Sequence, residues 1–338
     1  MGKLSESSAR PFIEQRQSVK VLMWTVVLAL LPGVLLNAFF FGIGIFIQLF
    51  IALITVVIID EAIALLRGQK IGNSISDGTA VVLVSIVAIS MPTYGHWWMC
   101  SMAAGCATIF GKHIYGGTGQ NLFNPAMVGV VFALVCFPSI STYWPSGNDV
   151  NLLSMTEGLK RIFTPSQMGL DAISGATLLE YERTQLSFAV MRSEFADSAL
   201  YGLFAERGWE WVNLAYLCGG LWLCFRRVIS YVVPVFFLGS LFVCASVMYS
   251  IDHTRFAGPL LHCFSGGAMM CAFFVATDPV SSPTGRLAAI VYAVLLGIFV
   301  YTFRNIGAYP EAVAFAVLLL NALAPLLDRL CSRQIYGH

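Results

Sequence analysis

The chain has 338 residues, of which 58% are hydrophobic and only 11% are charged, and its formal net charge is +1. A soluble domain is roughly 45–50% apolar and about 25% charged, so this chain has too few charges to cover a soluble surface. The composition excludes a disordered chain, a coiled coil and a disulfide-rich secreted domain, and it predicts an integral membrane protein. The balanced charge provides no bulk field that would attract nucleic acid, and we expect no nucleic-acid partner.

Ten apolar segments are candidates for membrane-spanning helices, which need about 20 mostly apolar residues. They cover residues 21–41, 44–66, 79–91, 97–111, 125–137, 209–225, 229–250, 257–276, 287–302 and 310–328. The third, fourth and fifth segments are short and are bounded by Pro92, Gly111 and Pro125. Short segments of this kind are typical of broken helices that line a site inside a membrane. The predicted fold class is an all-α polytopic membrane protein with some short or broken helices.

One long polar stretch, residues 138–208, separates the two groups of five segments. It is polar and mixed, with Pro138, Pro145, Gly147, Pro165 and Gly169, which indicates an extramembrane insert. The sequence therefore predicts an N-terminal segment (1–20), a first five-helix repeat (21–137), the insert (138–208) and a second five-helix repeat (209–330).

Lysine and arginine residues predict the orientation, because cytoplasmic loops of membrane proteins are enriched in them. If the N-terminus is cytoplasmic, the short outside loops contain only Arg255 and Arg304, and five further basic residues lie in the insert. The inside segments contain the other twelve, which are Lys3, Arg10, Arg16, Lys20, Arg67, Lys70, Lys112, Arg226, Arg227, Arg286, Arg329 and Arg333. This asymmetry predicts that both termini lie inside and that the insert lies outside.

Five spans in each half would give the halves opposite orientations, which is the geometry of an inverted repeat. Two pairs of prolines support a duplication. Pro125 and Pro310, which open the fifth and tenth segments, are 185 residues apart, and Pro92 and Pro279 are 187 apart. A duplicated bundle of this kind has its working site near the midplane, between the repeats.

Residues 171–177 of the insert read Asp-Ala-Ile-Ser-Gly-Ala-Thr. The Ser-Gly pair favours a tight, exposed turn, and the small alanine leaves room beside the hydroxyl of Thr177, which could accept a phosphoryl-linked group. An ordinary Ser-Gly turn is the alternative. The candidate motif residues beside Thr177 are Asp171, Ser174, Gly175 and Ala176.

A glycine-rich stretch, residues 111–126, lies between the fourth and fifth segments. Glycines let the backbone approach a planar ligand closely, and the helix start at Pro125 offers free N–H groups. A loop that needs glycine for its turns is the alternative. The candidate pocket residues are Gly116, Gly117, Gly119, Asn121 and Asn124.

Ionisable residues within membrane segments are functional candidates because burying them is costly. Our candidates for an ion path are His113, Asp278, Glu311 and Asp328. Three aspartates, Asp60, Asp77 and Asp328, could instead extend to a nearby interface, and Glu311 could simply stabilise a helix N-terminus. The nine cysteines form no C-x-x-C pair, and we expect no metal site.

These motifs resemble a family of membrane subunits. Residues 171–177 are similar to the D-x-x-[ST]-G-A-T site at which a flavin transferase links FMN to threonine through a phosphoester. Residues 111–126 resemble the G-K-x-x-x-G-G-x-G-x-N-x-F-N-P-A motif of the D subunit of the Rnf ion-translocating electron-transport complex and of the B subunit of the sodium-translocating NADH:quinone reductase. Residues 277–281 and 321–328 also fit these subunits, and the resemblance covers nearly the whole chain.

The resemblance implies a subunit of an ion-translocating ferredoxin:NAD oxidoreductase complex in a bacterial inner membrane, with the insert in the periplasm. It implies FMN on Thr177, a non-covalent riboflavin in the second pocket, and as partners the other subunits of the complex, a flavin transferase and membrane lipid. Coupled transport of Na⁺ or H⁺ is expected, although His113 stands where sodium-pumping relatives often have a carboxylate. The alternatives are a quinone-reductase B-type subunit, which has a longer N-terminal region, and a transporter or channel without redox chemistry.

Overall fold

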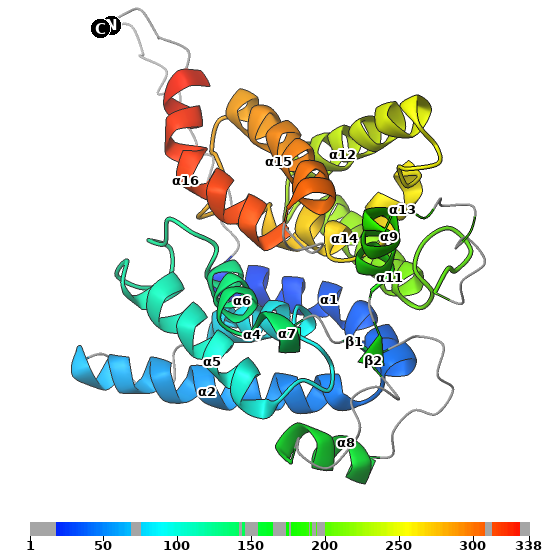
Figure 1. The fold of residues 1–338 in the computed structure, drawn as a ribbon. Helices are drawn as coiled ribbons and strands as arrows, with labels where there is room; N and C mark the ends of the chain where they lie inside the picture. The colour runs from blue at the N-terminus through cyan, green and yellow to red at the C-terminus, as the bar shows by residue number, and fades with distance from the viewer. Residues whose placement is uncertain are drawn as a thin grey trace, which may run out of the picture.

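The structure is a computed structural model that describes residues 18–68, 76–141, 144–145, 155–164, 174–175, 177–188, 190, 194, 200–307 and 313–331. In these residues the regular secondary structure is almost all helical (Figure 1). The named strands form one two-stranded antiparallel ribbon, in which Trp144 pairs with Gly175 and Pro145 pairs with Ser174.

The helices preceding the insert lie together in Figure 1. They are α1 (Val19–Phe41), α2 (Gly44–Leu66), α4 (Thr79–Ile89), α5 (Trp97–Cys106), which continues into a π-helical turn (Ala107–His113), and α6 (Pro125–Cys136). The helix α6 begins as its sequence predicts, because Pro125 occupies its first turn and the Asn124 side chain accepts a hydrogen bond from the Met127 N–H.

The helices that follow the insert form a second group. They are α11 (Trp209–Phe225), α12 (Val232–Ile251), α13 (Pro259–Phe264), α14 (Ala268–Met270) with a π-helical turn (Cys271–Val275), α15 (Arg286–Ile306) and α16 (Val313–Cys331). The insert contributes α7 (Pro138–Ser141), β1 (Trp144–Pro145), α8 (Met155–Phe163), β2 (Ser174–Gly175) and α9 (Leu178–Ser187). We call the two groups the first and second helix halves.

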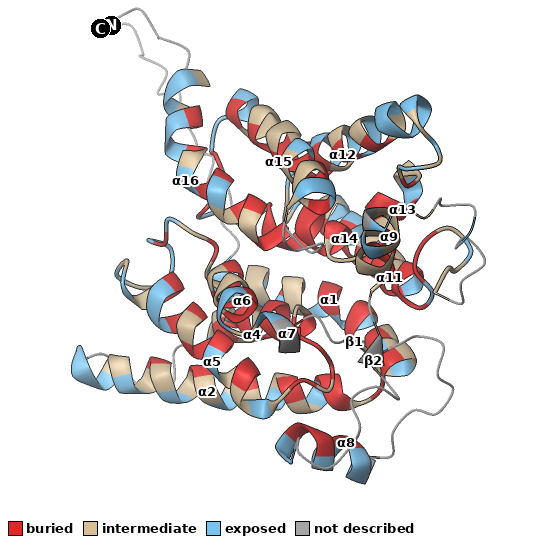
Figure 2. Cartoon of the chain, in the orientation of Figure 1, coloured by how far each residue is buried: buried red, intermediate tan, exposed pale blue. Residues whose placement is uncertain are grey.

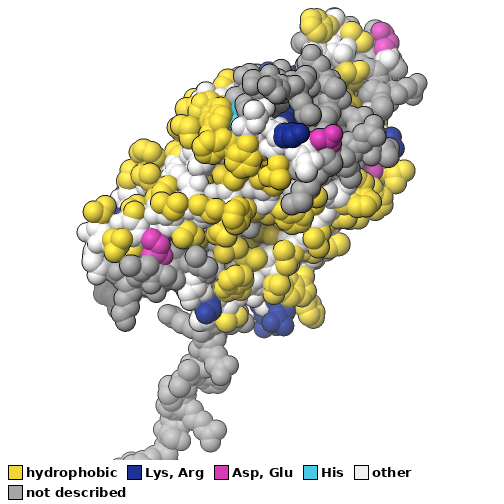
Figure 3. Space-filling view, turned by 90° about the horizontal axis from the view of Figure 1, so that it is seen from below, with side chains coloured by type: hydrophobic (Ala, Val, Ile, Leu, Met, Phe, Trp, Pro, Cys, Tyr) yellow, Lys and Arg dark blue, Asp and Glu magenta, His cyan; other side chains and the backbone are white. Residues whose placement is uncertain are grey.

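Each of the ten predicted segments contains helix, but the segments differ in length. Within the described part of the chain, α1, α2, α12, α15 and α16 are long and apolar enough to cross a membrane, whereas α4 and α6 are shorter apolar helices. The chain is therefore a multi-pass membrane protein. The outer faces of its helices carry many exposed residues (Figure 2), which include large apolar side chains such as Phe39 and Phe50. Hydrophobic side chains cover much of the face in Figure 3.

The eighth predicted segment, residues 257–276, is not one continuous helix. It breaks at Ser265, where Gly266 has a positive φ of 61°, and resumes as α14. The buried guanidinium of Arg304 donates hydrogen bonds to the carbonyl oxygens of His262 and Ser265. Irregular backbone is tolerated inside a membrane only where protein or a wet cavity satisfies it, and Arg304 supplies part of that here.

The two halves meet along two pairs of helices, α1 with α11 and α6 with α16. Two glycines allow the first pair to approach closely. A Cβ on Gly33 of α1 would lie 2.0 Å from the ring of Tyr216, and one on Gly219 of α11 would lie 2.2 Å from the carbonyl oxygen of Ala29. Small residues at such contacts are typical of membrane helix pairs. The main hydrophobic core contains buried residues of both halves.

Candidate functional site

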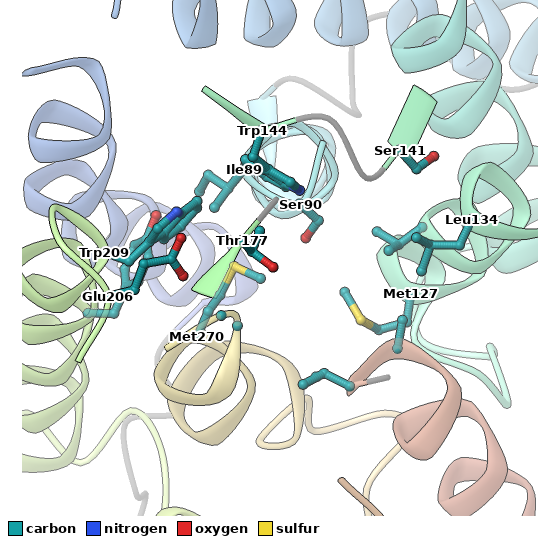
Figure 4. Close-up of a pocket in the computed structure, with 16 residues that line it drawn as sticks. Ile89, Ser90, Met127, Leu134, Ser141, Trp144, Thr177, Glu206, Trp209 and Met270 are labelled. Atoms are coloured by element: carbon teal, nitrogen blue, oxygen red, sulfur yellow. The ribbon is translucent and has the colours of Figure 1, made fainter. Parts of the chain in front are cut away.

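Two cavities lie between the helix halves. The first, which we call the insert-side cavity, encloses about 760 Å³ of empty space, including the part that is open to solvent. Side chains of α4, α6, α11, α14 and α16 line it, together with residues of the insert (Figure 4). Those labelled in the figure are Ile89, Ser90, Met127, Leu134, Ser141, Trp144, Thr177, Glu206, Trp209 and Met270.

Thr177 lines the insert-side cavity and is the N-cap of α9. Its hydroxyl oxygen accepts a hydrogen bond from the Glu180 N–H at 3.4 Å, which satisfies one of the free donors of the first turn. The next two residues, Leu178 and Leu179, are buried in a small core with Leu261. Local sequence therefore fixes the start of α9 and holds the hydroxyl of Thr177 at the cavity.

The structure describes only two of the four other motif residues, Ser174 and Gly175. The backbones of Ser174 and Gly175 form β2, whose pairing with β1 brings Trp144 to the same cavity as Thr177. Asp171 and Ala176 lie outside the described residues. Ser174 and Gly175 were predicted to form a turn. In the structure they form a short strand instead, because their backbone pairs with Pro145 and Trp144.

Two further residues of the insert-side cavity have no counterpart among the sequence-based candidates. Trp209 is only 7% exposed, and its ring meets that of Trp144 edge-on at a centroid distance of 5.2 Å. Glu206 is also 7% exposed and faces the same cavity (Figure 4). The sequence signal for each was its position: Glu206 lies just before the apolar helix α11, and Trp209 is its first residue.

The second cavity, which we call the glycine-loop cavity, has a volume of about 1040 Å³. The sequence pointed to a ligand pocket in one motif and to an ion path in another, and the structure places residues of both motifs on this cavity. Its polar lining is Thr79, Lys112, Thr118, Asn121, Asn124, Thr277 and Asp278, beside Gly119 and apolar side chains that include Leu83, Phe273 and Phe274.

Close packing and hydrogen bonds fix the first half of the glycine-rich stretch, residues 111–116. At its start, a Cβ on Gly111 would lie 2.5 Å from Cα of Pro125, so only glycine allows the π-helical turn to lie against α6. Arg67, at the C-terminal end of α2, donates hydrogen bonds to the carbonyl oxygens of His113 and Gly116 at 2.8 and 3.2 Å.

The five pocket candidates of this loop have different roles. Gly116, Gly117 and Gly119 all have φ between 89° and 117°, which only glycine adopts readily, so the turn interpretation applies to each of them. Of these three, Gly119 also lines the cavity, and so do Asn121 and Asn124.

Asp60 of α2 is buried and ion-paired, so the expectation that it extends to an interface is wrong. Its carboxylate contacts Lys112 Nζ at 2.8 Å and His113 Nε2 at 2.5 Å. The π-helical turn presents both of these neighbouring side chains to α2. Two sequence signals could have suggested this contact. Asp60 is an acidic residue inside the second apolar segment, and the basic pair Lys112-His113 follows the fourth.

The other ion-path candidates are separated from the glycine-loop cavity or not described. The Asp328 carboxylate accepts hydrogen bonds from the N–H groups of Thr284 and Gly285, and so caps α15. It does not appear among the described residues that line the cavity. Glu311 lies outside the described residues, and His113 contacts Asp60.

Hydrogen bonds cross between the halves beside the glycine-loop cavity. The Asn124 side-chain amide donates to the carbonyl oxygen of Val275 at 3.4 Å. With the Asn321 amide oriented to satisfy its neighbours, its oxygen accepts from the Asn124 N–H at 2.9 Å. On the cavity side, Asp278 accepts a hydrogen bond from the Ser281 hydroxyl at 2.8 Å. Among the described residues, no cluster of three or more His, Cys, Asp or Glu side chains could hold a metal ion.

Comparisons with known proteins agree with this architecture. Residues 6–337 match the NQR2, RnfD, RnfE family. The chain is 39% identical to the D subunit of the ion-translocating oxidoreductase complex of Aeromonas salmonicida, with 98% of each chain covered. It is 41% identical to the protein of the same name from Alcanivorax borkumensis, with 98% of this chain and 96% of the relative covered.

Proposed function

The chain belongs to the NQR2, RnfD, RnfE family and is a membrane subunit of an ion-translocating oxidoreductase complex, in which we propose that it carries electrons through FMN linked to Thr177. Its relatives match it from end to end, and each is named as the D subunit of such a complex. This favours the Rnf-type assignment over a quinone-reductase B-type subunit and over a transporter without redox chemistry. The activity that we propose for the whole complex is ferredoxin:NAD oxidoreduction coupled to Na⁺ or H⁺ transport.

The residues around Thr177 fit a flavin bound there as a phosphoester. The single observation that carries the proposal is that Thr177 lies on the wall of a cavity of about 760 Å³ with mostly apolar walls. FMN supplies the redox chemistry. The chain would position it between Trp144, Trp209 and Met270 and exclude water from it.

The glycine-loop cavity fits a second, non-covalent flavin, such as riboflavin. Its amides, Asn121 and Asn124, are both nearly buried and can donate and accept hydrogen bonds at the edge of a planar ring. Its apolar walls, which include Phe273 and Phe274, suit the faces of such a ring. A tethered flavin on one side and a non-covalent one on the other would place two redox groups within the same helix interface.

An inverted repeat would explain why both cavities lie between the halves. Equivalent helices in the two halves make equivalent contacts: α2 packs on α4 and α5 as α12 packs on α13 and α15, and α5 packs on α6 as α15 packs on α16. The first helices of the halves pack on each other, and so do the last. Such contacts are expected around a pseudo-two-fold axis.

The same repeat would make Asp278 a candidate for coupling ion transport to electron transfer. Its carboxylate lines the cavity and is hydrogen-bonded by Ser281. A change in ligand charge beside a carboxylate changes the energy of a bound cation. Two remaining candidates, His113 and Asp328, are not among the described lining residues and would act outside this cavity. Glu311 remains a candidate from the sequence.

The exposed surface of the chain suggests what surrounds it in the membrane. Its exposed apolar side chains, such as Leu35, Phe39 and Phe50, suit membrane lipid or the helices of partner subunits. We place both termini in the cytoplasm and the insert in the periplasm of a bacterial inner membrane, where a flavin transferase would modify Thr177.

The proposal is tested by mass spectrometry and in-gel fluorescence of the full-length chain from cells that contain a flavin transferase. The wild type should carry one FMN mass on the peptide that contains Thr177. The variant Thr177→Val should carry none, whereas Thr184→Val, on the exposed side of α9, should be labelled like the wild type. An unmodified Thr177 peptide in the wild-type chain would refute the covalent flavin.

A further inference from the structure

The cation on the wall of the glycine-loop cavity is Lys112, and a carboxylate outside that wall holds it. Lys112 Nζ lies 2.8 Å from Asp60 Oδ2, and their side chains are only 9% and 4% exposed. Lys112 lines the cavity, whereas Asp60 is not among its described lining residues. The lysine is therefore the partner of this ion pair that lies at the cavity wall.

Stability alone does not explain a buried pair of this kind. Removing two charges from water is costly, and well-packed apolar residues of similar volume often serve stability as well or better. The pair is also supported by geometry that a simple α-helix would not provide. The π-helical turn that presents Lys112 and His113 to Asp60 is of a rare type that is frequent at functional sites.

We propose that Lys112, held by Asp60, sets the charge of the glycine-loop cavity so that it favours the reduced form of the flavin bound there. This inference rests on the proposed non-covalent flavin. A reduced flavin or iron–sulfur carrier of the complex would supply two electrons, and the ring would also take up one proton. The neutral isoalloxazine then becomes an anion while the Lys112 ammonium keeps its protons.

The sign of the effect follows from the charges that face the ligand. An ammonium group attracts an anion and has little net interaction with a neutral ring, so it binds the reduced form more tightly than the oxidised form. Asp278 lies on the same cavity and has the opposite effect. Asp60 is a positioning residue, because it fixes the ammonium group without lining the cavity.

The test is a redox titration of the full-length chain in a Thr177→Val background, in which riboflavin is the remaining ligand. Lys112→Gln should weaken the preference for reduced over oxidised riboflavin at least tenfold, which lowers the midpoint potential by about 30 mV for a two-electron couple. Lys112→Arg should restore most of the wild-type potential. Lys160→Gln, at an exposed site on α8, is the matched control and should leave the potential unchanged.

Loss of one partner can destabilise the protein, so the double variant Asp60→Asn with Lys112→Gln is titrated as well. It removes both charges of this ion pair and should also lower the potential, by less than the single variant. Bound riboflavin with a wild-type potential in both variants would overturn the role of Lys112 and leave the second flavin standing. Absence of non-covalent flavin from the wild-type chain at saturating riboflavin would overturn both.

Discussion

The insert-side cavity and the glycine-loop cavity both lie between the helix halves, but their polar groups differ in number and in origin. The first is lined mainly by apolar and aromatic side chains, with Glu206 as its charged lining residue among those described. The second carries Lys112, Asp278 and two asparagines. A tethered ligand has already lost much of its freedom before it docks, so it needs few specific contacts. A ligand without a tether must be held by hydrogen bonds and charges.

The two cavities also differ in what fixes their walls. Around the insert-side cavity, short-range structure contributes directly, since Thr177 is placed by the cap of α9. Around the glycine-loop cavity, contacts between distant residues predominate, such as Asp60 with Lys112 and Asn124 with Val275. We therefore expect substitutions at the glycine-loop cavity to have the larger structural effects.

The largest effect is expected for Asp60→Ala, which leaves Lys112 buried without its carboxylate. Removing one partner of a buried ion pair costs about 3–5 kcal/mol. The variant should melt at a lower temperature in detergent and lose non-covalent riboflavin, while Thr177 remains modified. Asp252→Ala, which removes a half-exposed loop carboxylate paired with Arg255 at the surface, is the control and should melt close to the wild type. Equal loss of both flavins in Asp60→Ala would show that the two cavities are not held independently.

A smaller effect is expected for Met270→Ala at the insert-side cavity. Met270 is 6% exposed and already borders empty space, so its truncation should cost about 2 kcal/mol, at the lower end of the range for buried methionines. Attachment to Thr177 should be complete, but the enlarged cavity should let water reach the ring and shift its fluorescence. Met102→Ala, at an exposed site on α5, is the control. An unchanged spectrum would indicate that the flavin ring lies elsewhere.

The smallest effect concerns the helix that carries the attachment site. Burial raises the pKa of Glu180, and Arg183 lowers it in part. Because the folded-state pKa lies above the unfolded one, the resulting stabilisation is complete below the unfolded pKa. It is lost as the pH rises through the raised value.

Hydrogen exchange of the α9 amides, corrected for the intrinsic pH dependence, checks this effect. In the wild type, the protection of these amides should fall as the pH rises from the unfolded pKa of Glu180 through its raised folded pKa. In Glu180→Gln it should stay level. Glu157→Gln, on the exposed side of α8, should behave like the wild type. The same pH dependence in Glu180→Gln as in the wild type would rule out this carboxyl as its source.

Much of the local structure could be predicted from the sequence. Segments 44–66 and 125–137 agree with α2 and α6 to within a residue, because apolar runs and a capping asparagine before proline are local signals. The break within segment 257–276 was not predicted. Ser265-Gly266-Gly267 interrupts the apolar run and could have suggested the break, whereas the hydrogen bonds that satisfy the broken end come from Arg304, a distant residue.

The sequence singled out residues that line the two cavities but missed some of their neighbours. Thr177 and Asn124 were candidates because each belongs to a motif of consecutive residues, and each lines a cavity. Glu206 and Trp209 were missed because only the fold brings them to the cavity of Thr177. Asp328 was predicted for an ion path, but its observed contacts cap α15, and no motif distinguishes these two roles.

The sequence by itself determined that this is a polytopic membrane protein, where most of its helices run and which short motifs are candidates for a functional site. These properties depend on hydrophobic content and on contacts within a few residues. Only the tertiary structure decided that the glycine-rich loop and Asp278 share one cavity and that Asp60 holds Lys112. The physical reason is that lipid is as apolar as a helix interface. Hydrophobic patterning therefore cannot show which faces of two membrane helices will meet.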